Sequence, residues 1–236
     1  MEIWQKTDEN PGGHQMSRAF ILEGIKNHIS SDKSDETRRK DGSDRIAQHS
    51  RGILPASPNT RIKKVNKFIE KVEASQASIE RVSKRYLAKS ISEWVRDHNL
   101  PNAIRMGSDE RLAPIREQNK NMLEIKEGPS DGQDLVSVSH GEGGVVETGT
   151  LALFSSKDNP TTLNFLPENH IIVLNESSIV DHYEDIWSLV RERFGEGVMP
   201  RNLNFITGPS RSADIEQTLL LGAHGPIRLH VLLLRE

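Results

Sequence analysis

The sequence predicts an α/β protein: a mostly parallel sheet in a three-layer arrangement with helices on both faces, preceded by an N-terminal arm that is partly helical and partly irregular. Two observations lead to this fold class. From residue 60 onward, short apolar runs typical of buried strands alternate with amphipathic helical patterns. Before residue 60, the segment 30–44 contains no apolar side chain, which indicates a linker or an arm ordered only by contact with a partner. We therefore expect an arm over residues 1–59 and a folded domain over residues 60–236.

The first half of the chain is predicted to be mainly helical. Within the arm, residues 17–29 carry apolar side chains at helical spacing. The folded domain is expected to begin with a helix at 60–72, followed by a second helix at 78–98 that Asn99-Leu100-Pro101 ends. Residues 103–106 and 122–125 are short strand candidates.

From residue 135 the pattern changes to strands separated by polar turns. Residues 135–140 alternate as a strand does, and the glycine-rich stretch 140–144 is predicted to be a bend. Glu147-Thr148-Gly149-Thr150 is expected to form a tight turn before a strand at 151–154. Residues 170–174 indicate a buried strand, and 182–194 indicate an amphipathic helix.

The stretch 202–234 is predicted to form strand, loop, helix, loop and strand. An apolar run stops at Gly208-Pro209, and Ser210 or Ser212 can cap a helix that ends at Gly222. Residues 229–234 are nearly all apolar, as expected for a strand buried on both faces. Loops this short imply two parallel strands joined by a right-handed crossover.

Composition excludes several classes of function. The chain of 236 residues has no cysteine, so disulfides, thiolate chemistry, iron–sulfur clusters and Cys-ligated zinc are ruled out. No apolar run approaches the length of a membrane helix, and the N-terminus has no basic segment followed by an apolar one. We therefore expect a soluble, cytoplasmic protein without a membrane partner.

Charge is divided unevenly along the chain. Residues 1–126 carry 24 Lys and Arg against 18 Asp and Glu, whereas residues 127–236 carry 7 against 16. In the basic half the two signs are interleaved at helical spacing, which favours a solvated helical surface over a nucleic-acid-binding face. A nucleic-acid-binding arm at 31–51 remains the less favoured alternative.

Three polar loops, at 140–150, 207–212 and 222–226, follow predicted strands. Ligands of open α/β sheets bind at the carboxyl ends of strands, so convergence of these loops would create a pocket. Glu147 is the candidate catalytic base or nucleophile, and Arg211 with the amides of 208–212 is suited to hold an anion. The plainer alternative is that Glu147 is an ordinary turn carboxylate and that Arg211 is a solvated side chain beside a capped helix.

Common catalytic and metal-binding signatures are missing. The nine histidines include no H-x-x-x-H pair and no H-E-x-x-H sequence, so we expect no metal site. The chain also lacks a P-loop, a dinucleotide-binding glycine fingerprint after a strand, and a G-x-S-x-G nucleophile elbow.

Four segments occur together in one order: Glu147-Thr148-Gly149-Thr150, Leu166-Pro167 followed by His170-Ile171, the run 207–216 (TGPSRSADIE), and Gly222-Ala223-His224-Gly225-Pro226. Together they resemble the lactate-utilization protein C family, whose members carry a LUD domain. The resemblance covers roughly residues 60–236. It implies a three-layer α/β domain akin to the superfamily of ribose-phosphate isomerases, CoA-transferases and formyltetrahydrofolate cyclo-ligases.

The resemblance also implies a role. Proteins of this type accompany iron–sulfur subunits in the oxidation of L-lactate to pyruvate, and a chain without cysteine matches the subunit that holds no cluster and no cofactor. It further implies ligand contacts at the matching loops, namely Thr148, Gly149, Thr150, Gly208, Ser210, Arg211, Asp214, His224 and Gly225.

Two functions remain open at this point. The first is an accessory, cofactor-free subunit of lactate oxidation that binds a small carboxylate or helps to assemble iron–sulfur partner subunits. The second is a stand-alone enzyme of the CoA-transferase and cyclo-ligase superfamily that binds an anionic or nucleotide ligand and uses Glu147. In either case the N-terminal arm is a candidate for contact with a second copy of the chain in a homo-oligomer.

Overall fold

The structure is a computed structural model, and it describes residues 13–29, 34–49, 51–213 and 219–235. The chain divides into two units, Met1–Ile53 and Leu54–Glu236. The first unit holds two helices, α1 (Gly13–Ile29) and α2 (Asp35–Gln48). α1 contains the predicted helix at 17–29.

The expectation of a linker at 30–44 was wrong for its second part, because α2 occupies most of it. Local interactions explain this helix. Ser34 caps it by accepting a hydrogen bond from the Thr37 amide at 3.2 Å, and Asp35 pairs with Arg38 one turn later. None of its residues is buried. The lack of apolar side chains in this segment therefore did not exclude a helix.

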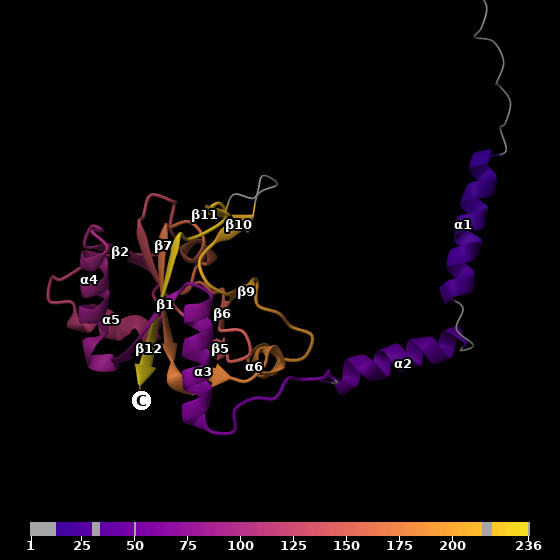
Figure 1. Ribbon diagram of the computed structural model, residues 1–236, viewed down its shortest axis with the longest axis horizontal. Coiled ribbons are helices and arrows are strands. Elements are labelled where there is room, and N and C mark those ends of the chain that lie inside the picture. The colour runs from indigo at the N-terminus through magenta and orange to yellow at the C-terminus, as the bar shows by residue number, and fades with distance from the viewer. Residues whose placement is uncertain (1–12, 30–33, 50, 214–218, 236) are drawn as a thin grey trace, which may run out of the picture. The chain divides into compact units, whose positions relative to one another are not determined.

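The second unit is organised around a six-stranded sheet in which every pair of neighbours is parallel, with the order β1-β12-β7-β4-β2-β3 (Figure 1). The strands, in chain order, are β1 (Ser78–Ser83), β2 (Ala103–Met106), β3 (Glu124–Glu127), β4 (Val136–His140), β7 (Asn169–Asn175) and β12 (Arg228–Arg235). This sheet confirms the predicted α/β class with a mostly parallel sheet.

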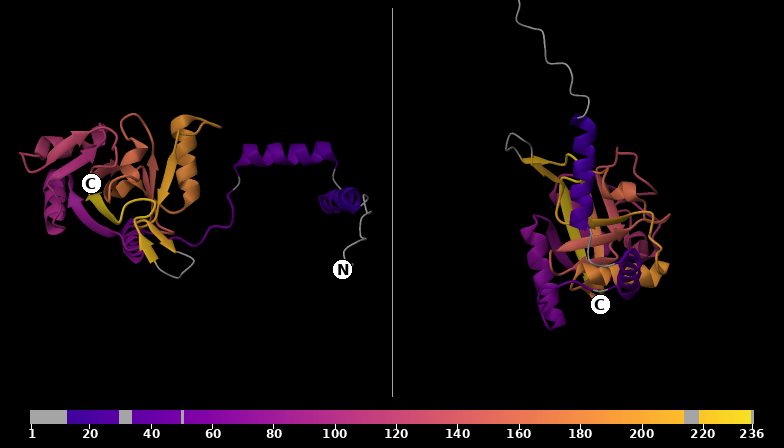
Figure 2. Two further views of the ribbon diagram at one scale, coloured as in Figure 1. Left: turned by 90° about the horizontal axis from the view of Figure 1, so that it is seen from above. Right: turned by 90° about the vertical axis from the view of Figure 1, so that its right-hand side faces the viewer.

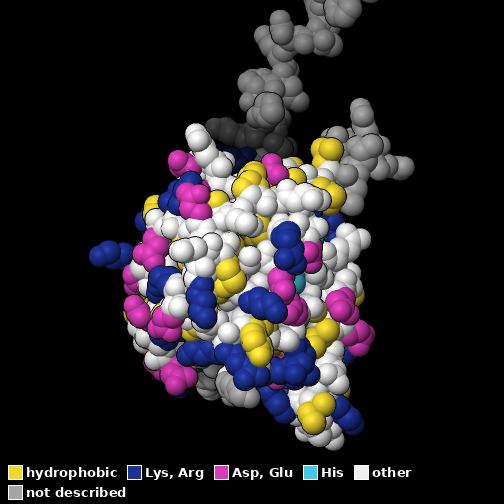
Figure 3. All heavy atoms as spheres, turned by 90° about the vertical axis from the view of Figure 1, so that its left-hand side faces the viewer, with side chains coloured by type: hydrophobic (Ala, Val, Ile, Leu, Met, Phe, Trp, Pro, Cys, Tyr) yellow, Lys and Arg dark blue, Asp and Glu magenta, His cyan; other side chains and the backbone are white. Residues whose placement is uncertain are grey.

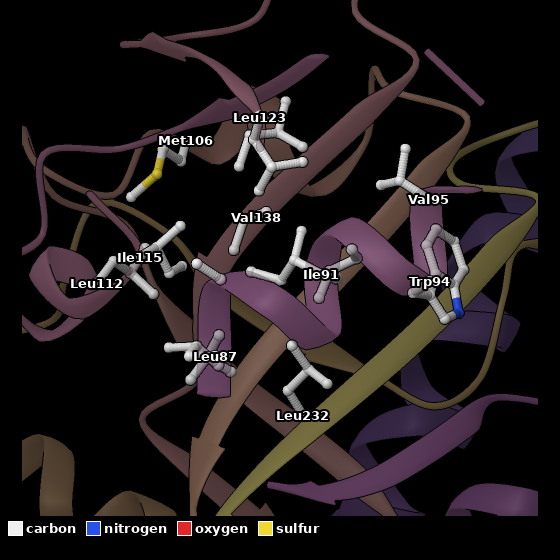
Figure 4. Close-up of a cluster of buried hydrophobic side chains, with 14 of the residues drawn as sticks. Leu87, Ile91, Trp94, Val95, Met106, Leu112, Ile115, Leu123, Val138 and Leu232 are labelled. Carbon is white, nitrogen blue, oxygen red and sulfur yellow. The ribbon is translucent and has the colours of Figure 1, made fainter. Parts of the chain in front are cut away.

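Helices α4 (Leu87–Asp97) and α5 (Ala113–Gln118) cover one face of this sheet. In Figure 4, Leu87 and Ile91 of α4 point toward the strands that carry Val138 and Leu232. All four side chains are completely buried. On the outer side of this layer, basic and acidic side chains are interspersed (Figure 3), as the interleaved sequence pattern predicts.

The opposite face of the sheet packs against α3 (Arg61–Ala74) and a second, four-stranded sheet. That sheet has the order β8-β5-β6-β9, with β8 at Ile179–Val180, β5 at Gly143–Val145, β6 at Thr150–Phe154 and β9 at Leu203–Ile206. α6 (Tyr183–Phe194) covers its outer side, and Figure 2 shows α4 and α6 on opposite sides of the strands. Helices thus lie on both faces, as predicted.

Three local predictions were wrong. The predicted helix at 78–98 is a strand, β1, followed by a short 3-10 helix and α4, because Ser78–Ser83 pairs with β12 along its whole length. The predicted bend at 140–144 contains strand β5. Its glycines are required by close packing, since a Cβ on Gly144 would lie 2.7 Å from the Phe68 ring of α3.

The third error concerns 202–234. The strands at its two ends exist, but β9 belongs to the smaller sheet, where it is antiparallel to β6, and β12 belongs to the larger one. Between them, β10 (Arg211–Ala213) pairs antiparallel with β11 (Leu219–Leu221), so these residues do not form the predicted helix. Residues 214–218 lie outside the described residues. The predicted parallel crossover is therefore replaced by a passage from one sheet to the other.

No helix in the described part of the chain is long and apolar enough to span a bilayer.

Candidate functional site

Glu147 lies in the turn that joins β5 to β6. Gly149 has φ of +73°, a conformation that favours glycine, and a Cβ there would lie 2.7 Å from the backbone of Lys71 in α3. On the other side, the Glu147 amide donates to the Asp181 carbonyl at 3.3 Å. The turn is thus fixed between the last turn of α3 and the segment that enters α6.

A pocket of about 380 Å³ lies beside this turn. Its charged and titratable lining residues come from two helical regions and the turn, and they are Lys67 and Lys71 of α3, Glu147, and Asp181 with His182. The rest of the lining is largely apolar and consists of Pro55, Ala56, Ser57, Pro58 and Val146. The pocket therefore combines an apolar wall with groups of both charges, as small-molecule sites commonly do.

His182 holds the Glu147 carboxylate at one end of the pocket. Its Nδ1 lies 3.2 Å from Glu147 Oε2. His182 is also the N-cap of α6: its side chain accepts a hydrogen bond from the Asp185 amide, and Asp185 accepts one from the His182 amide at 3.0 Å. This reciprocal capping fixes the imidazole. A carboxylate next to a fixed imidazole is a pair suited to accept and return a proton.

The carboxylate of Asp181 is already paired with two other side chains. Lys64 Nζ lies 2.6 Å from its Oδ2, and the Ser57 hydroxyl donates to its Oδ1. Burial acts to raise the pKa of Asp181, but the hydrogen bonds from Lys64 and Ser57 outweigh burial and hold the pKa below its usual value. Asp181 therefore anchors the segment 55–58 as a wall of the pocket.

The two lysines of the pocket differ in their pairing. Lys67 forms an ion pair with Glu70 at 2.9 Å, and this pairing lowers the pKa of Glu70. The Lys71 side chain makes no hydrogen bond or ion pair with any described residue, although its charge contributes to lowering the pKa of Glu70. Lys71 is thus the cation of the pocket that is available to a ligand.

Behind Glu147, four hydroxyl groups form a connected network. Thr148 and Thr150 lie 2.6 Å apart, and both contact the Tyr183 hydroxyl, at 2.8 and 2.7 Å. Thr150, which is completely buried, also lies 2.7 Å from the Thr207 hydroxyl. This network connects the turn of Glu147 with α6 and with the loop that follows β9. These threonines position the turn, and they are not part of the pocket lining.

The loop after β9 meets the same end of α3 as the Glu147 turn. A Cβ on Gly208 would lie 2.2 Å from the Ser75 carbonyl oxygen, and Arg211 Nη2 donates to that oxygen at 2.8 Å. The structure therefore places the 140–150 and 207–212 loops at the same end of α3, and the 222–226 loop contacts the second of them through Ser210. The expectation that Arg211 begins a helix whose amides hold an anion was wrong, because Arg211 begins strand β10. Its guanidinium instead stabilises the carboxyl end of α3.

The remaining predicted residues lie away from the pocket. The Ser210 amide donates to the Pro226 carbonyl at 2.8 Å, and the His224 amide lies 3.3 Å from the Ser210 hydroxyl. Gly225 lies next to Ser210 and Phe165. Asp214 lies outside the described residues. Of the ten predicted site residues, Glu147 alone is a lining residue of this pocket in the described chain.

Sequence reasoning missed Lys67, Lys71, Asp181 and His182. Helical spacing favours a solvated position for Lys67 and Lys71, and nothing in the sequence indicates that this helix and the start of α6 meet at Glu147. One signal was present in Gly149, since a glycine after Glu-Thr indicated a tight turn, but the turn's neighbour is set by tertiary packing.

A second charged cluster lies beyond the carboxyl ends of β2 and β4. Arg111 donates to both oxygens of Glu142 at 2.7 Å and to Asp109 at 2.6 Å, and Arg193 contacts Glu142 at 2.6 Å. Glu142 and Asp109 are 7% and 11% exposed. Burial acts to raise the pKa of Asp109, but the hydrogen bonds from Arg111 outweigh it and hold the pKa below its usual value.

His140 lies next to this cluster and is almost completely buried. Burial, followed by the charge of Arg111, lowers the pKa of His140 to about 4, so the ring is neutral near pH 7. Among the described residues, no group of three or more His, Cys, Asp or Glu side chains is arranged to hold a metal ion.

Comparisons with known proteins agree with this architecture. The sequence profile of the LUD domain matches residues 132–234. The lactate utilization protein C of Bacillus subtilis is 38% identical over 102 residues, and that of Geobacillus thermodenitrificans is 39% identical over 94 residues. These matches cover 43% and 39% of this chain and 42% and 39% of the relatives, so the chain spans about two fifths of their length.

A solved structure supports the fold over a longer stretch. The crystal structure of a DUF162 family protein from Deinococcus radiodurans matches with a TM-score of 0.57 and 22% sequence identity, covering 75% of this chain and all of that one. At this identity the likeness concerns the fold alone. Residues 132–234 therefore match the LUD domain, and the chain is similar over about two fifths of its length to proteins named lactate utilization protein C.

Proposed function

We propose that this protein is a cofactor-free subunit of a cytoplasmic lactate-utilization system, and that it acts with iron–sulfur partner subunits in the oxidation of L-lactate to pyruvate. In this role the chain contributes a binding site for a small carboxylate. Electron transfer belongs to the partner subunits, because a chain without cysteine holds no iron–sulfur cluster of the usual Cys-ligated kind.

The observation that carries the proposal is the relation of residues 132–234 to proteins named lactate utilization protein C. The pocket beside Glu147 supports it, because an unpaired Lys71 and an apolar wall suit an organic carboxylate. Glu147 and His182 belong to the segment that the family profile matches.

The test is a reconstituted assay of lactate-dependent dye reduction with the iron–sulfur subunits of a lactate-oxidising system. We expect the rate to fall strongly when this chain is left out and to return when it is added back. A Lys63→Met variant, changed at an exposed lysine outside the pocket, is expected to restore the rate fully. An unchanged rate without the chain would refute the proposed function.

A second function is favoured by one feature, the placement of the Glu147 carboxylate at an open pocket. In a stand-alone acyl transfer, this carboxylate would attack the carbonyl of an acyl-CoA thioester and form a glutamyl anhydride, with the CoA thiolate as leaving group. Borohydride or hydroxylamine trapping of wild type and Glu147→Gln, followed by mass spectrometry, tests this chemistry. A modification of Glu147 that depends on acyl-CoA would favour it over the accessory role.

A further inference from the structure

We propose that the pocket between α3 and the Glu147–His182 pair binds 2-hydroxycarboxylates, with the ligand carboxylate on Lys71 and the ligand hydroxyl on Glu147. This inference rests on the proposed function, because it names the ligand class of the same site. It is argued from the charges of the pocket, from the spacing of its groups and from its apolar wall.

Most charges around the pocket are already neutralised by neighbours. Asp181 is paired with Lys64 at 2.6 Å, and Lys67 is paired with Glu70 at 2.9 Å. Two groups of the lining make no ion pair with Lys, Arg, Asp or Glu among the described residues: the ammonium of Lys71 and the carboxylate of Glu147, whose Oε2 lies 3.2 Å from His182 Nδ1. A ligand therefore meets one positive group and one negative group.

These two groups are separated in the structure. Both line the pocket, but no ion pair within 4.0 Å joins Lys71 to Glu147 in the described chain. Direct pairing would have closed the site. A bridging ligand therefore needs an anionic group for Lys71 and, at a different atom, a hydrogen-bond donor for Glu147.

The environment of Glu147 favours a hydroxyl as that donor. One oxygen of Glu147 lies 3.2 Å from the His182 ring, which is itself fixed by the start of α6. A ligand hydroxyl can donate a hydrogen bond to this carboxylate. A second carboxylate at this position would be repelled, so dicarboxylates are disfavoured.

The apolar wall of the pocket explains why the proposed ligand class includes 2-hydroxycarboxylates larger than L-lactate. Pro55, Ala56, Pro58 and Val146 form an apolar surface, and the volume of about 380 Å³ is of the order found for ligands larger than a three-carbon acid. An alkyl substituent on the hydroxyl-bearing carbon would lie against the prolines. Ser57 holds this wall in place through its hydrogen bond to Asp181.

The two halves of the pocket also differ in their relation to known proteins. The family profile spans residues 132–234 and so includes Glu147 and His182, whereas Lys71 and the segment 55–58 lie outside it. The hydroxyl-binding end is thus in the family segment, and the carboxylate-binding end with its apolar wall is in this chain's own N-terminal part. Lys71 is therefore the residue that determines specificity for the carboxylate.

Direct binding to the full chain, without partner subunits, tests the inference. Isothermal titration or ligand-observed NMR would compare L-lactate, 2-hydroxyhexanoate, propionate and L-alanine at concentrations up to about 10 mM, since ligands of this size bind weakly. We expect 2-hydroxyhexanoate to bind most tightly, because it also contacts the apolar wall. Propionate is expected to bind roughly tenfold more weakly than L-lactate, because it lacks the hydroxyl.

Three variants assign the contacts. Lys71→Met is expected to weaken L-lactate binding at least about tenfold, whereas Lys63→Met on the same helix leaves it unchanged. Glu147→Met is expected to remove the preference for L-lactate over propionate while propionate still binds. Circular dichroism and melting temperature verify that each variant is folded.

Clear outcomes would overturn the inference. These are equal binding of L-lactate by wild type and Lys71→Met, binding of L-alanine but not of L-lactate, or no binding of any of the four compounds. Failure of the proposed function is distinguishable from these results. Specific binding by the isolated chain without any effect on reconstituted lactate oxidation refutes the function alone, and dependence of oxidation on the chain without binding refutes the inference alone.

Discussion

The molecule contains two clusters of charged side chains that are similar in composition. They differ in whether every charged group has a hydrogen-bonded partner. The network of Asp109, Arg111, Glu142 and Arg193 satisfies its own charges through short hydrogen bonds, and its two carboxylates are nearly inaccessible. In the cluster beside Glu147, the Lys71 side chain lines a pocket and has no hydrogen bond or ion pair with a described residue.

This difference separates a structural role from a binding role. A buried network in which every charge has a partner holds elements together. Removal of one member leaves its partners as uncompensated charges in a low-dielectric environment. A cation that has no partner costs little to remove from the folded state and is available to a ligand. The two clusters are therefore expected to respond in opposite ways to substitution.

The largest effect is expected from Arg111→Met. This change leaves Glu142 and Asp109 buried without their main partner, which should reduce the free energy of unfolding by about 3 kcal/mol. Urea denaturation at pH 7 measures it. A loss below about 1 kcal/mol would show that Arg193 and solvent compensate, and that the network is not the rigid element described above.

Gly149→Ala is expected to have the next largest effect. A Cβ at φ +73° is strained and would also meet the Lys71 backbone at 2.7 Å, so we expect a loss of about 2 kcal/mol in unfolding free energy. Because the turn must move away from α3, L-lactate binding should fall too. Gly132→Ala provides a matched control, because Gly132 also has a positive φ, +94°, but a Cβ there would meet no atom within 4 Å. Full retention of stability in Gly149→Ala would contradict the close contact.

The pH dependence of the free energy of unfolding tests the contribution of the buried histidines. His140, His170 and His230 have folded-state pKa values lowered mainly by burial, to about 4, 3 and 4. Below about pH 6.5 the unfolded chain binds protons at these residues while the folded chain does not, so stability falls as the pH falls.

His140→Leu removes one of these proton-binding sites. The loss of stability between pH 6.5 and pH 5 should therefore shrink by about 1.5 kcal/mol relative to wild type, since each proton contributes about 1.4 kcal/mol per pH unit. Urea denaturation at the two pH values gives the difference. An unchanged pH dependence would mean that His140 is protonated in the folded protein at pH 5.

The smallest effect on stability is expected at the open cluster. Lys71→Met should change the free energy of unfolding by less than about 0.5 kcal/mol, because no ion pair or hydrogen bond with a described residue is lost. Comparing its free energy of unfolding with that of Arg111→Met measures directly how the two clusters differ. A large loss at Lys71 would reveal a structural partner and would remove the reason to treat it as a ligand-binding cation.

Local patterns predicted those elements whose side chains report burial on one or two faces. The stripe of Val65, Phe68 and Val72 identified α3, and the apolar runs identified β7 and β12. Prediction failed where local signals were compatible with two structures. Ile79 and Val82 are spaced as in a helix, yet they lie in β1 because β12, which is distant in sequence, offers a parallel partner.

Of the candidate site, only the turn that carries Glu147 was predictable from the sequence. Glu-Thr-Gly-Thr indicated the tight turn that carries Glu147, and the positive φ of Gly149 agrees with that interpretation. The predicted helix start at Arg211 was wrong, because Arg211–Ala213 form a strand and the Arg211 guanidinium donates to the Ser75 carbonyl after α3. A cap-forming serine followed by an acidic residue is compatible with a helix but does not exclude a strand that a neighbour stabilises.

The sequence by itself determined the class of the fold, the absence of cysteine chemistry, the amphipathic α3 and the turn that presents Glu147. Only the tertiary structure decided that Lys71, Glu147 and His182 line one pocket and that Arg211 does not. The physical reason is that periodicity and turn chemistry act over a few residues, whereas the neighbours of a charged side chain depend on which distant segments pack together. Charge pairing between such segments decides which groups remain available to a ligand.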